Sequence, residues 1–333
     1  MGKSRLREPI IATVKEITSL RCILTYTKLK INRINNFTKV KSMFEIKKIK
    51  GNTYYFEAFS NVGIYIPDGK NAILIDSCDH PRMVKGLDRQ LTEMGVTVSV
   101  IIDTHCHVDH ICGNRFFSEK YGCRILSTKK EQAFISYPAM EPEFYYAGIN
   151  TDKGKNPFFY IEPSESEIIT EENLPKGFEI VPLPGHSFEM IGVKTPDGVL
   201  FLADAILSKK TWDEYKLPFF YNVNSTLETL EEIKKLEADV YVPSHNPPLE
   251  EIGELADYNI EKLKEKKENV YELCEGRSFD DLFAAVMGSQ ELNIRTEKYP
   301  MYAVMVRNLL QALVNDNRIH ALCENNRLVY HRR

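Results

Sequence analysis

The stretch DTHCHVDHICGN, residues 103–114, places three of the chain's eight histidines and two aspartates within twelve positions. It follows directly on the apolar run VSVIID (98–103), a pattern that predicts a buried strand. His105 and His107 are two positions apart, so in extended backbone their side chains point to the same side. The sequence therefore predicts a strand that delivers imidazole and carboxylate groups where it ends.

Three further apolar runs end in the same kinds of side chain. The runs EIVPLPGH (179–186), VLFLAD (199–204) and DVYVPSH (239–245) end in His186, Asp204 and His245. Such runs, apolar on both faces, are typical of a sheet covered by helices on each side. Because open α/β sheets carry their sites at the carboxyl ends of strands, we expect these groups to meet those of the 103–114 stretch.

Imidazole and carboxylate groups on short strand-end loops are the ligands that divalent metal ions prefer. We expect one ion to bind His105, His107 and His186. We expect a second ion to bind Asp109, His110 and His245, and Asp204 to bridge the two ions through its carboxylate. Two such ions can hold a hydroxide at neutral pH and polarise a substrate oxygen. The pattern predicts a hydrolase without a protein nucleophile, in which Asp109 is also the catalytic residue.

The motifs HxHxDH (105–110), PGHS (184–187), LFLAD (200–204) and VPSH (242–245) resemble the metallo-β-lactamase superfamily, with the full dinuclear ligand set of glyoxalase II and its relatives. This resemblance covers about residues 44–250. It implies an α/β fold, a four-layer αββα sandwich, and two divalent metal ions, zinc in most members and iron or manganese in some. The run NAILIDS resembles the family's early strand, whose aspartate, here Asp76, supports the metal loop without binding metal.

Helical patterns separate and follow the strands. Met83, Leu87 and Leu91 recur at helix spacing before Gly95, and a capping box, Ser225 to Glu228, is expected to start a second helix. Residues 251–333 contain amphipathic helices and then a hairpin with its turn at Asn325 and Asn326. That order resembles the winged-helix tail of lactamase-beta-2-like hydrolases. We therefore expect a metallo-β-lactamase-type domain at 43–250 and a helical, winged-helix-like domain at 251–333.

The basic charge is concentrated at the start of the chain. Residues 1–42 carry ten Lys or Arg and two Glu, which is +8, so a whole-chain charge of −4 leaves −12 for the remainder. This segment is a transit-like or nucleic-acid-binding arm, a solvated extension, or the product of a start codon upstream of Met43. We favour the last two, because strand-like residues begin directly after Met43. We interpret 1–42 as a basic extension outside the native fold.

Composition limits the remaining choices. Seven scattered cysteines suit a reducing cytoplasm better than a disulfide framework, and no apolar run approaches the roughly 18 residues of a membrane span. Cys106 alternates away from its neighbouring histidines, which predicts a buried structural thiol. The expected partner is a small molecule; membranes are not expected, and a homodimer is compatible with the sequence.

Two aromatic segments, 137–166 and 211–224, are expected to shape a substrate pocket, although most of their rings would pack locally. We expect hydrolysis of a small neutral or weakly charged ester, thioester or lactone. The alternative is a ribonuclease or phosphodiesterase of the same fold. The residues after 42 have a net charge of −12 and lack a stripe of Lys and Arg side chains. Both features disfavour nucleic acid as a partner. A non-catalytic binding protein would have no physical reason to keep seven ligands.

Overall fold

The computed structural model describes residues 44–146 and 161–333, without the side chains of 144–146, so the basic extension 1–42 lies outside the described residues. The first sheet has seven strands in chain order, β1 to β7. Neighbours are antiparallel from β1 to β4 and parallel from β4 to β7. The strands are β1 (Ile46–Lys50), β2 (Thr53–Phe56), β3 (Val62–Tyr65), β4 (Asn71–Ile75), β5 (Thr97–Ile102), β6 (Arg124–Ser127) and β7 (Glu167–Ile168).

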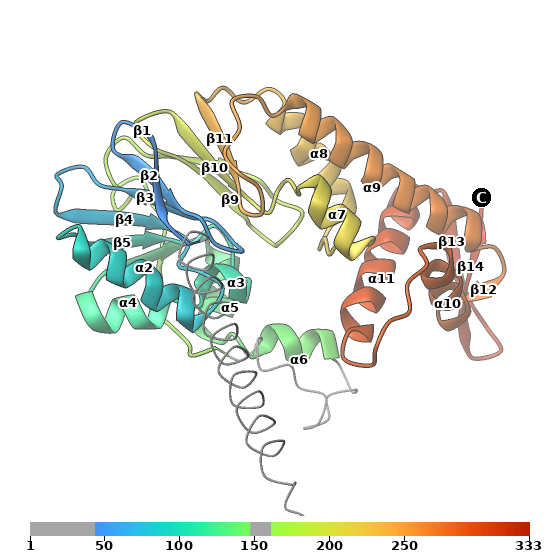
Figure 1. The fold of residues 1–333 in the computed structure, drawn as a ribbon. Coiled ribbons are helices and arrows are strands. Elements are labelled where there is room, and N and C mark those ends of the chain that lie inside the picture. The colour runs from blue at the N-terminus through green and yellow to red at the C-terminus, as the bar shows by residue number, and fades with distance from the viewer. Residues whose placement is uncertain (1–43, 147–160) are drawn as a thin grey trace, which may run out of the picture. The chain divides into compact units, whose positions relative to one another are not determined.

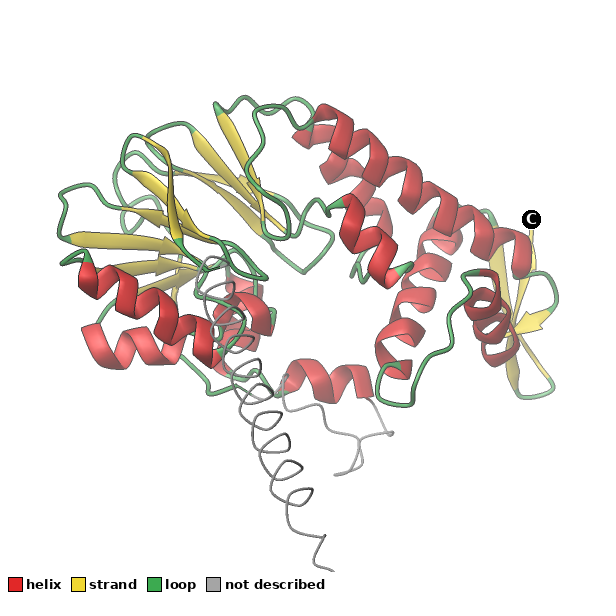
Figure 2. Ribbon diagram, in the orientation of Figure 1, coloured by secondary structure: helices red, strands yellow, loops and turns green. Residues whose placement is uncertain are grey.

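The second sheet has four strands in the order β11-β10-β9-β8, with only the β10–β11 pair parallel. Its strands are β8 (Glu179–Pro182), β9 (Ile191–Lys194), β10 (Val199–Ala203) and β11 (Val240–Pro243). Every residue of β10 is buried, as its uninterrupted apolar run predicts. The two sheets face each other across a shared core (Figure 2), in which Ile75 and Ile102 of the first sheet pack with Val193 and Phe201 of the second.

Helices cover the outer face of each sheet (Figure 1). On the first sheet lie α2 (Pro81–Glu93) and α4 (Asn114–Tyr121). On the second, α8 (Val223–Ile233) and the first turns of α9 (Gly253–Leu273) pack against β10, through residues such as Leu230 and Ile260. The chain is thus the four-layer αββα sandwich that the resemblance implies, because the central strands of both sheets, such as β4 and β10, are buried on both faces and need cover on each side.

Short helices connect the strands around one end of the sandwich. They are α3 (Val108–Ile111), α5 (Lys129–Ser136), α6 (Met140–Tyr146) and α7 (Lys209–Tyr215). Of these, α3 carries Asp109 and His110 and follows the loop with His105 and His107, and α7 follows the loop that begins with Asp204. This end of the sandwich is therefore where the structure concentrates polar side chains.

Two helix predictions need correction. Helix α8 begins at Val223 and not at the expected capping box, because the side chain of Asn222 caps it by accepting a hydrogen bond from the Ser225 amide at 3.1 Å. In α2 the buried stripe is Val84, Leu87 and Leu91, while Met83 is only partly buried. In both helices the apolar periodicity correctly predicted that a helix is present. It did not predict where α8 begins or which residues of α2 are buried.

The C-terminal region combines helices with a small sheet of order β12-β14-β13. Its elements are α9, β12 (Arg277–Ser278), α10 (Phe279–Ser289), α11 (Tyr299–Asn315), β13 (Ile319–Glu324) and β14 (Arg327–Arg332). The predicted hairpin is confirmed, since Asn325 and Asn326 form its turn with φ of 48° and 61°. Trp212 of α7 and Phe220, which lies between α7 and α8, are buried in the core of this region. No helix among the described residues has the length and apolarity to span a bilayer.

Candidate metal centre

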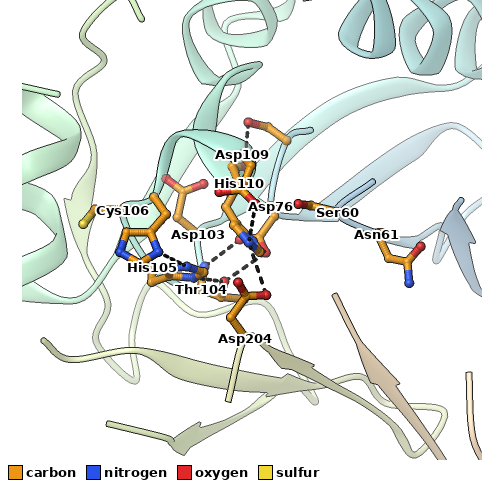
Figure 3. A network of polar contacts seen from close by, with 12 residues as sticks. Ser60, Asn61, Asp76, Asp103, Thr104, His105, Cys106, Asp109, His110 and Asp204 are labelled. Atoms are coloured by element: carbon orange, nitrogen blue, oxygen red, sulfur yellow. Dashed lines mark hydrogen bonds and ion pairs between the residues drawn. The ribbon is translucent and has the colours of Figure 1, made fainter. Parts of the chain in front are cut away.

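The seven predicted ligands come together at one end of the sandwich, between the two sheets. The loop after β5 carries His105 and His107 and continues into α3 with Asp109 and His110 (Figure 3). From the second sheet, His186 follows β8, Asp204 directly follows β10, and His245 follows β11. The strand ends converge because β5 and β10 lie on facing sheets and both carry their polar groups after the carboxyl end.

The first group consists of three imidazoles. Nδ1 of His107 lies 3.1 Å from Nε2 of His105 and 2.9 Å from Nε2 of His186. Three nitrogen atoms this close cannot all be joined by hydrogen bonds from neutral rings, since each neutral ring carries one proton. A single ion with Zn–N bonds of about 2.0–2.1 Å needs donor atoms roughly this far apart. These three imidazoles could therefore hold one divalent metal ion.

The second group joins Asp109, His110 and His245 through the carboxylate of Asp204. Oδ1 of Asp204 lies 3.5 Å from Nε2 of His110, and its Oδ2 lies 3.2 Å from Nε2 of His245. The same Oδ2 is 3.4 Å from Nε2 of His186 in the first group. Asp204 therefore stands between the two groups, where a bridging ligand must be.

Surrounding groups determine which nitrogen of each ring faces the centre. Nδ1 of His110 donates to Oδ2 of Asp76 at 2.7 Å, and Nδ1 of His245 donates to the Phe59 carbonyl at 2.7 Å. In both rings the inward atom is thus Nε2, the atom that takes up a proton or a cation.

The two rings of the HxH motif are oriented in the same manner. The hydroxyl of Thr104 donates to Asp76 at 2.9 Å, so it accepts from Nδ1 of His105 at 3.1 Å. Nε2 of His107 lies 3.4 Å from the Glu141 carboxyl, which leaves its Nδ1 facing the centre. Four imidazoles therefore turn the ring nitrogen opposite their supporting contact toward the same small volume, the orientation that metal ligation requires.

Two buried atoms support the metal interpretation directly. Nε2 of His110 and Oδ1 of Asp204 are both inaccessible and lie 3.5 Å from each other, and among the described residues neither has a hydrogen-bond partner. Leaving a buried donor or acceptor unpaired costs about 1–3 kcal/mol. Both atoms point into the cluster, so the residues present fit a cation, which would satisfy the two atoms at once.

The pKa values of the histidines differ between the first and the second ligand group. Burial, followed by the charge of His107, lowers the pKa of His186 to about 3, and burial with the His110 charge holds that of His105 well below its usual range. In the second group, burial would lower the pKa of His245, but the Asp204 carboxylate raises it to about 9. His105 and His186 are thus neutral imidazoles, and the second group has a field that attracts positive charge.

A cavity of about 210 Å³ opens over the centre. His107, Asp109, His186, Asp204 and His245 all line it. Its walls are largely apolar and include Met301 from the C-terminal region. The apolar and aromatic lining residues are Phe59, Val108, Leu207, Tyr215, Pro218, Phe219 and Met301, and the remaining polar ones are Thr211, Glu141 and Glu214. The ligands are therefore accessible to a small molecule that lies against apolar side chains.

The structure describes the aromatic rings of segment 211–224, whereas most rings of segment 137–166 lie outside the described side chains. In 211–224, Phe219 lies 5.8 Å from the His107 ring and Tyr215 also lines the cavity, while Trp212 and Phe220 are buried in the core. In 137–166, the six aromatic rings from Phe144 to Tyr160 that we expected to contribute lie outside the described side chains. Of the five rings in 211–224, Trp212 and Phe220 pack in the core, Tyr215 and Phe219 line the cavity and Tyr221 is exposed, so the expectation that most rings pack locally holds for two of them.

Several site residues had no usable signal in the sequence. Glu141 and Glu131 stand in helical segments where a glutamate is ordinarily solvated, yet both are buried beside the histidine loops. Met301 enters the cavity from α11, about a hundred residues after Asp204. Cys106 is buried at 2% exposure and packs with Ile111 and Ile135, which confirms the predicted buried thiol.

The sequence profile of the Metallo-beta-lactamase superfamily matches residues 56–245, which include all seven ligands and both sheets from β3 onward. This match covers more than half of the chain. The chain belongs to the metallo-beta-lactamase superfamily, and it is an enzyme of the hydrolase class.

Among individual proteins, the chain is similar to the Beta-lactamase-like protein 2 homolog of Drosophila melanogaster, with 25% identity over 65% of this chain and 68% of that protein. It is also similar to the Hydroxyacylglutathione hydrolase of Brucella ovis, with 28% identity over 44% of this chain. The chain spans about half of that second relative, 48% of its length.

Solved structures share the fold at low identity. A Beta-lactamase domain protein from Burkholderia ambifaria aligns with a TM-score of 0.66 and 16% identity, over 87% of this chain and 95% of that one. A metallo-beta-lactamase family protein from Thermus thermophilus aligns with a TM-score of 0.62 and 17% identity, over 88% and 99%. Both alignments extend well beyond the matched 56–245 region, so the fold they share includes part of the C-terminal region.

Proposed function

We propose that this chain is a two-metal hydrolase of small uncharged or weakly charged esters, thioesters or lactones. The observation that carries the proposal is the convergence of seven ligand side chains, five of them imidazoles, at the floor of an apolar cavity. Bound there, two divalent cations would lower the pKa of water and polarise an acyl oxygen. The nitrogen-rich ligand set favours zinc, with iron or manganese as the alternatives.

Within this scheme the protein's own groups have separate tasks. Asp109 lines the cavity and accepts a hydrogen bond from Ser60 Oγ at 2.8 Å. Burial would raise the pKa of Asp109, but the His110 charge lowers it, so the carboxylate is ionised where the attacking water would lie. We assign Asp109 the role of orienting that water and accepting its proton, in addition to holding metal.

The residues that line the cavity favour an apolar, uncharged substrate. Its described lining contains no lysine or arginine, while Glu141 and Glu214 add negative charge. A hydroxyacylglutathione, the substrate class in the name of the Brucella relative, has an anionic glutathione moiety that such a lining does not neutralise. We therefore infer thioester or ester chemistry of the same kind on an acyl group without additional carboxylates.

The test is chelator-sensitive turnover by metal-reconstituted protein on four substrates: an uncharged acyl thioester, a glutathione thioester, a lactone and a short single-stranded RNA. Hydrolysis of the uncharged acyl substrates, lost on chelation and restored by zinc, is the expected result. RNA cleavage without acyl cleavage would overturn the substrate assignment. Absence of bound metal after reconstitution would overturn the two-metal proposal itself.

A further inference from the structure

Glu131 is a buried carboxyl group for which the proposed chemistry has no direct use. It lies in the first turn of α5 and is 0% exposed. A buried carboxylate is stable only when it is paired or fully hydrogen-bonded. In the described part of the chain no ion pair involves Glu131, so its hydrogen bonds must account for its position.

Those hydrogen bonds connect two separate loops. Oε2 of Glu131 accepts from the Cys106 amide at 3.0 Å, and Oε1 accepts from the Glu189 amide at 2.7 Å. The Ser187 hydroxyl lies 2.9 Å from both oxygens. The carboxyl group is thus surrounded by donors from the loop after β5 and from the loop after β8.

The positions of these donors relate Glu131 to the metal centre. Cys106 lies between His105 and His107 (Figure 3), and Ser187 directly follows His186. One carboxyl group therefore holds both loops that supply the three-imidazole group, whose nitrogens lie 2.9 and 3.1 Å apart. Metal ligands must be held within about 0.5 Å of their working geometry, and their supporting contacts provide that precision.

The second group has different supports. Asp76 orients His110, the Phe59 carbonyl orients His245, and Ser60 contacts Asp109. Each of these contacts is made by a residue that forms no hydrogen bond with Glu131. A change at Glu131 should therefore affect one metal position more than the other.

We propose that Glu131 is a positioning residue that sets the geometry of the His105, His107 and His186 site and leaves the Asp109, His110 and His245 site largely independent. The inference rests on the proposed two-metal function but concerns metal affinity alone. Supporting residues of this kind commonly alter metal affinity 10–100-fold.

The test compares Glu131→Gln with Ile135→Val in the full chain. Gln keeps the size of the side chain but replaces one acceptor oxygen by an NH₂ group, which cannot accept from the Cys106 or Glu189 amide. Ile135 lies one turn further along α5, is 0% exposed and packs with Cys106, so its truncation disturbs the same helix without removing a hydrogen bond. Zinc content and the two zinc dissociation constants, from competition with a chromophoric chelator, are the readouts.

Glu131→Gln is expected to bind one zinc ion about 10–100-fold more weakly and the other unchanged, while Ile135→Val binds both as the wild type does. In a His186→Ala background, Glu131→Gln should have no further effect on the remaining ion. Retention of both affinities by Glu131→Gln, or equal weakening of both, would overturn the inference.

If Glu131→Gln does not fold, Ser187→Ala removes one of the donors and should weaken the same ion by a smaller factor. Unchanged zinc affinities in folded Ser187→Ala would then overturn the inference. Wild-type protein that binds no zinc would instead overturn the proposed function, so the two failures are distinguishable.

Discussion

Nδ1 of His110 lies 2.7 Å from Oδ2 of Asp76, and both side chains are buried, at 0% and 3% exposure. The same carboxylate accepts two hydrogen bonds from Thr104, through its amide and its hydroxyl. Asp76 therefore connects β4 to the loop after β5 and orients both His110 directly and His105 through Thr104. The residue that resembles the supporting aspartate of the superfamily is placed to act on both metal positions.

Replacing Asp76 by asparagine tests this relationship. Asn tolerates the left-handed backbone at this position, where φ is 63°, so the loop should keep its shape. The change removes a charged acceptor from His110 and Thr104, and we expect zinc affinity to fall about 10–100-fold at one or both positions. Zinc competition measures the effect, with the surface change Asp88→Asn as the control. Unaltered affinities would contradict the orienting role.

Asp204→Ala removes the carboxylate that stands between the two groups. We expect loss of bound zinc and a fall in turnover larger than the ~100-fold typical of supporting residues, because a direct ligand is lost. Zinc content and kcat/KM on the best acyl substrate are measured together. Asp239→Ala, which removes only an exposed ion pair with Lys50, is the control. Normal turnover by Asp204→Ala would refute the ligand assignment.

Phe219→Ala tests the apolar wall of the cavity. The ring lies 5.8 and 6.0 Å from the His107 and His186 rings and lines the cavity. Its loss should raise KM for an apolar acyl substrate about tenfold, equivalent to ~1.4 kcal/mol, with a smaller change in kcat. Tyr221→Ala, two residues away and outside the cavity lining, should leave both parameters unchanged. Equal effects of the two variants would remove Phe219 from the substrate site.

Cysteine reactivity should follow burial. Burial raises the pKa of the Cys112 and Cys123 thiols to about 11 and that of Cys78 and Cys106 well above the usual range. Since only the thiolate reacts, these four should resist alkylation at pH 8, whereas exposed Cys323 should be modified quickly. Mass spectrometry of iodoacetamide-treated native protein gives the order. Rapid modification of Cys106 would show that the histidine loop opens in solution.

The substitution Asn259→Ala tests how much the contact between α9 and the segment after β10 contributes to stability. The buried amide of Asn259 accepts from the Leu207 amide at 3.0 Å and from the Trp212 indole at 2.8 Å, and it donates to the Leu207 carbonyl. Asn259→Ala leaves these buried groups unpaired, so the free energy of unfolding should fall by about 2–4 kcal/mol. Denaturant unfolding measures it, with Lys264→Ala at an exposed position of α9 as the control. A loss below about 0.5 kcal/mol, the usual surface value, would count against this role.

Short-range patterns predicted the buried strands and the candidate ligands, and the resemblance of the ligand motifs to the superfamily implied the four-layer sandwich. Apolar runs such as 199–203 identify buried strands, and a histidine or aspartate directly after such a run identifies a strand-end group. The same local information failed at Ser225, where an asparagine three residues earlier caps α8. It also could not distinguish the buried Glu131 and Glu141 from solvated glutamates on a helix surface.

The sequence by itself determined the elements, the chemical identity of the ligand groups and the hairpin at Asn325 and Asn326. Only the tertiary structure decided that Glu131 joins the loops of Cys106 and Ser187, and that Met301 lines the cavity. The physical reason is that these contacts join residues far apart in the chain. Their distances depend on how two sheets and the C-terminal helices pack, and no local periodicity encodes that packing.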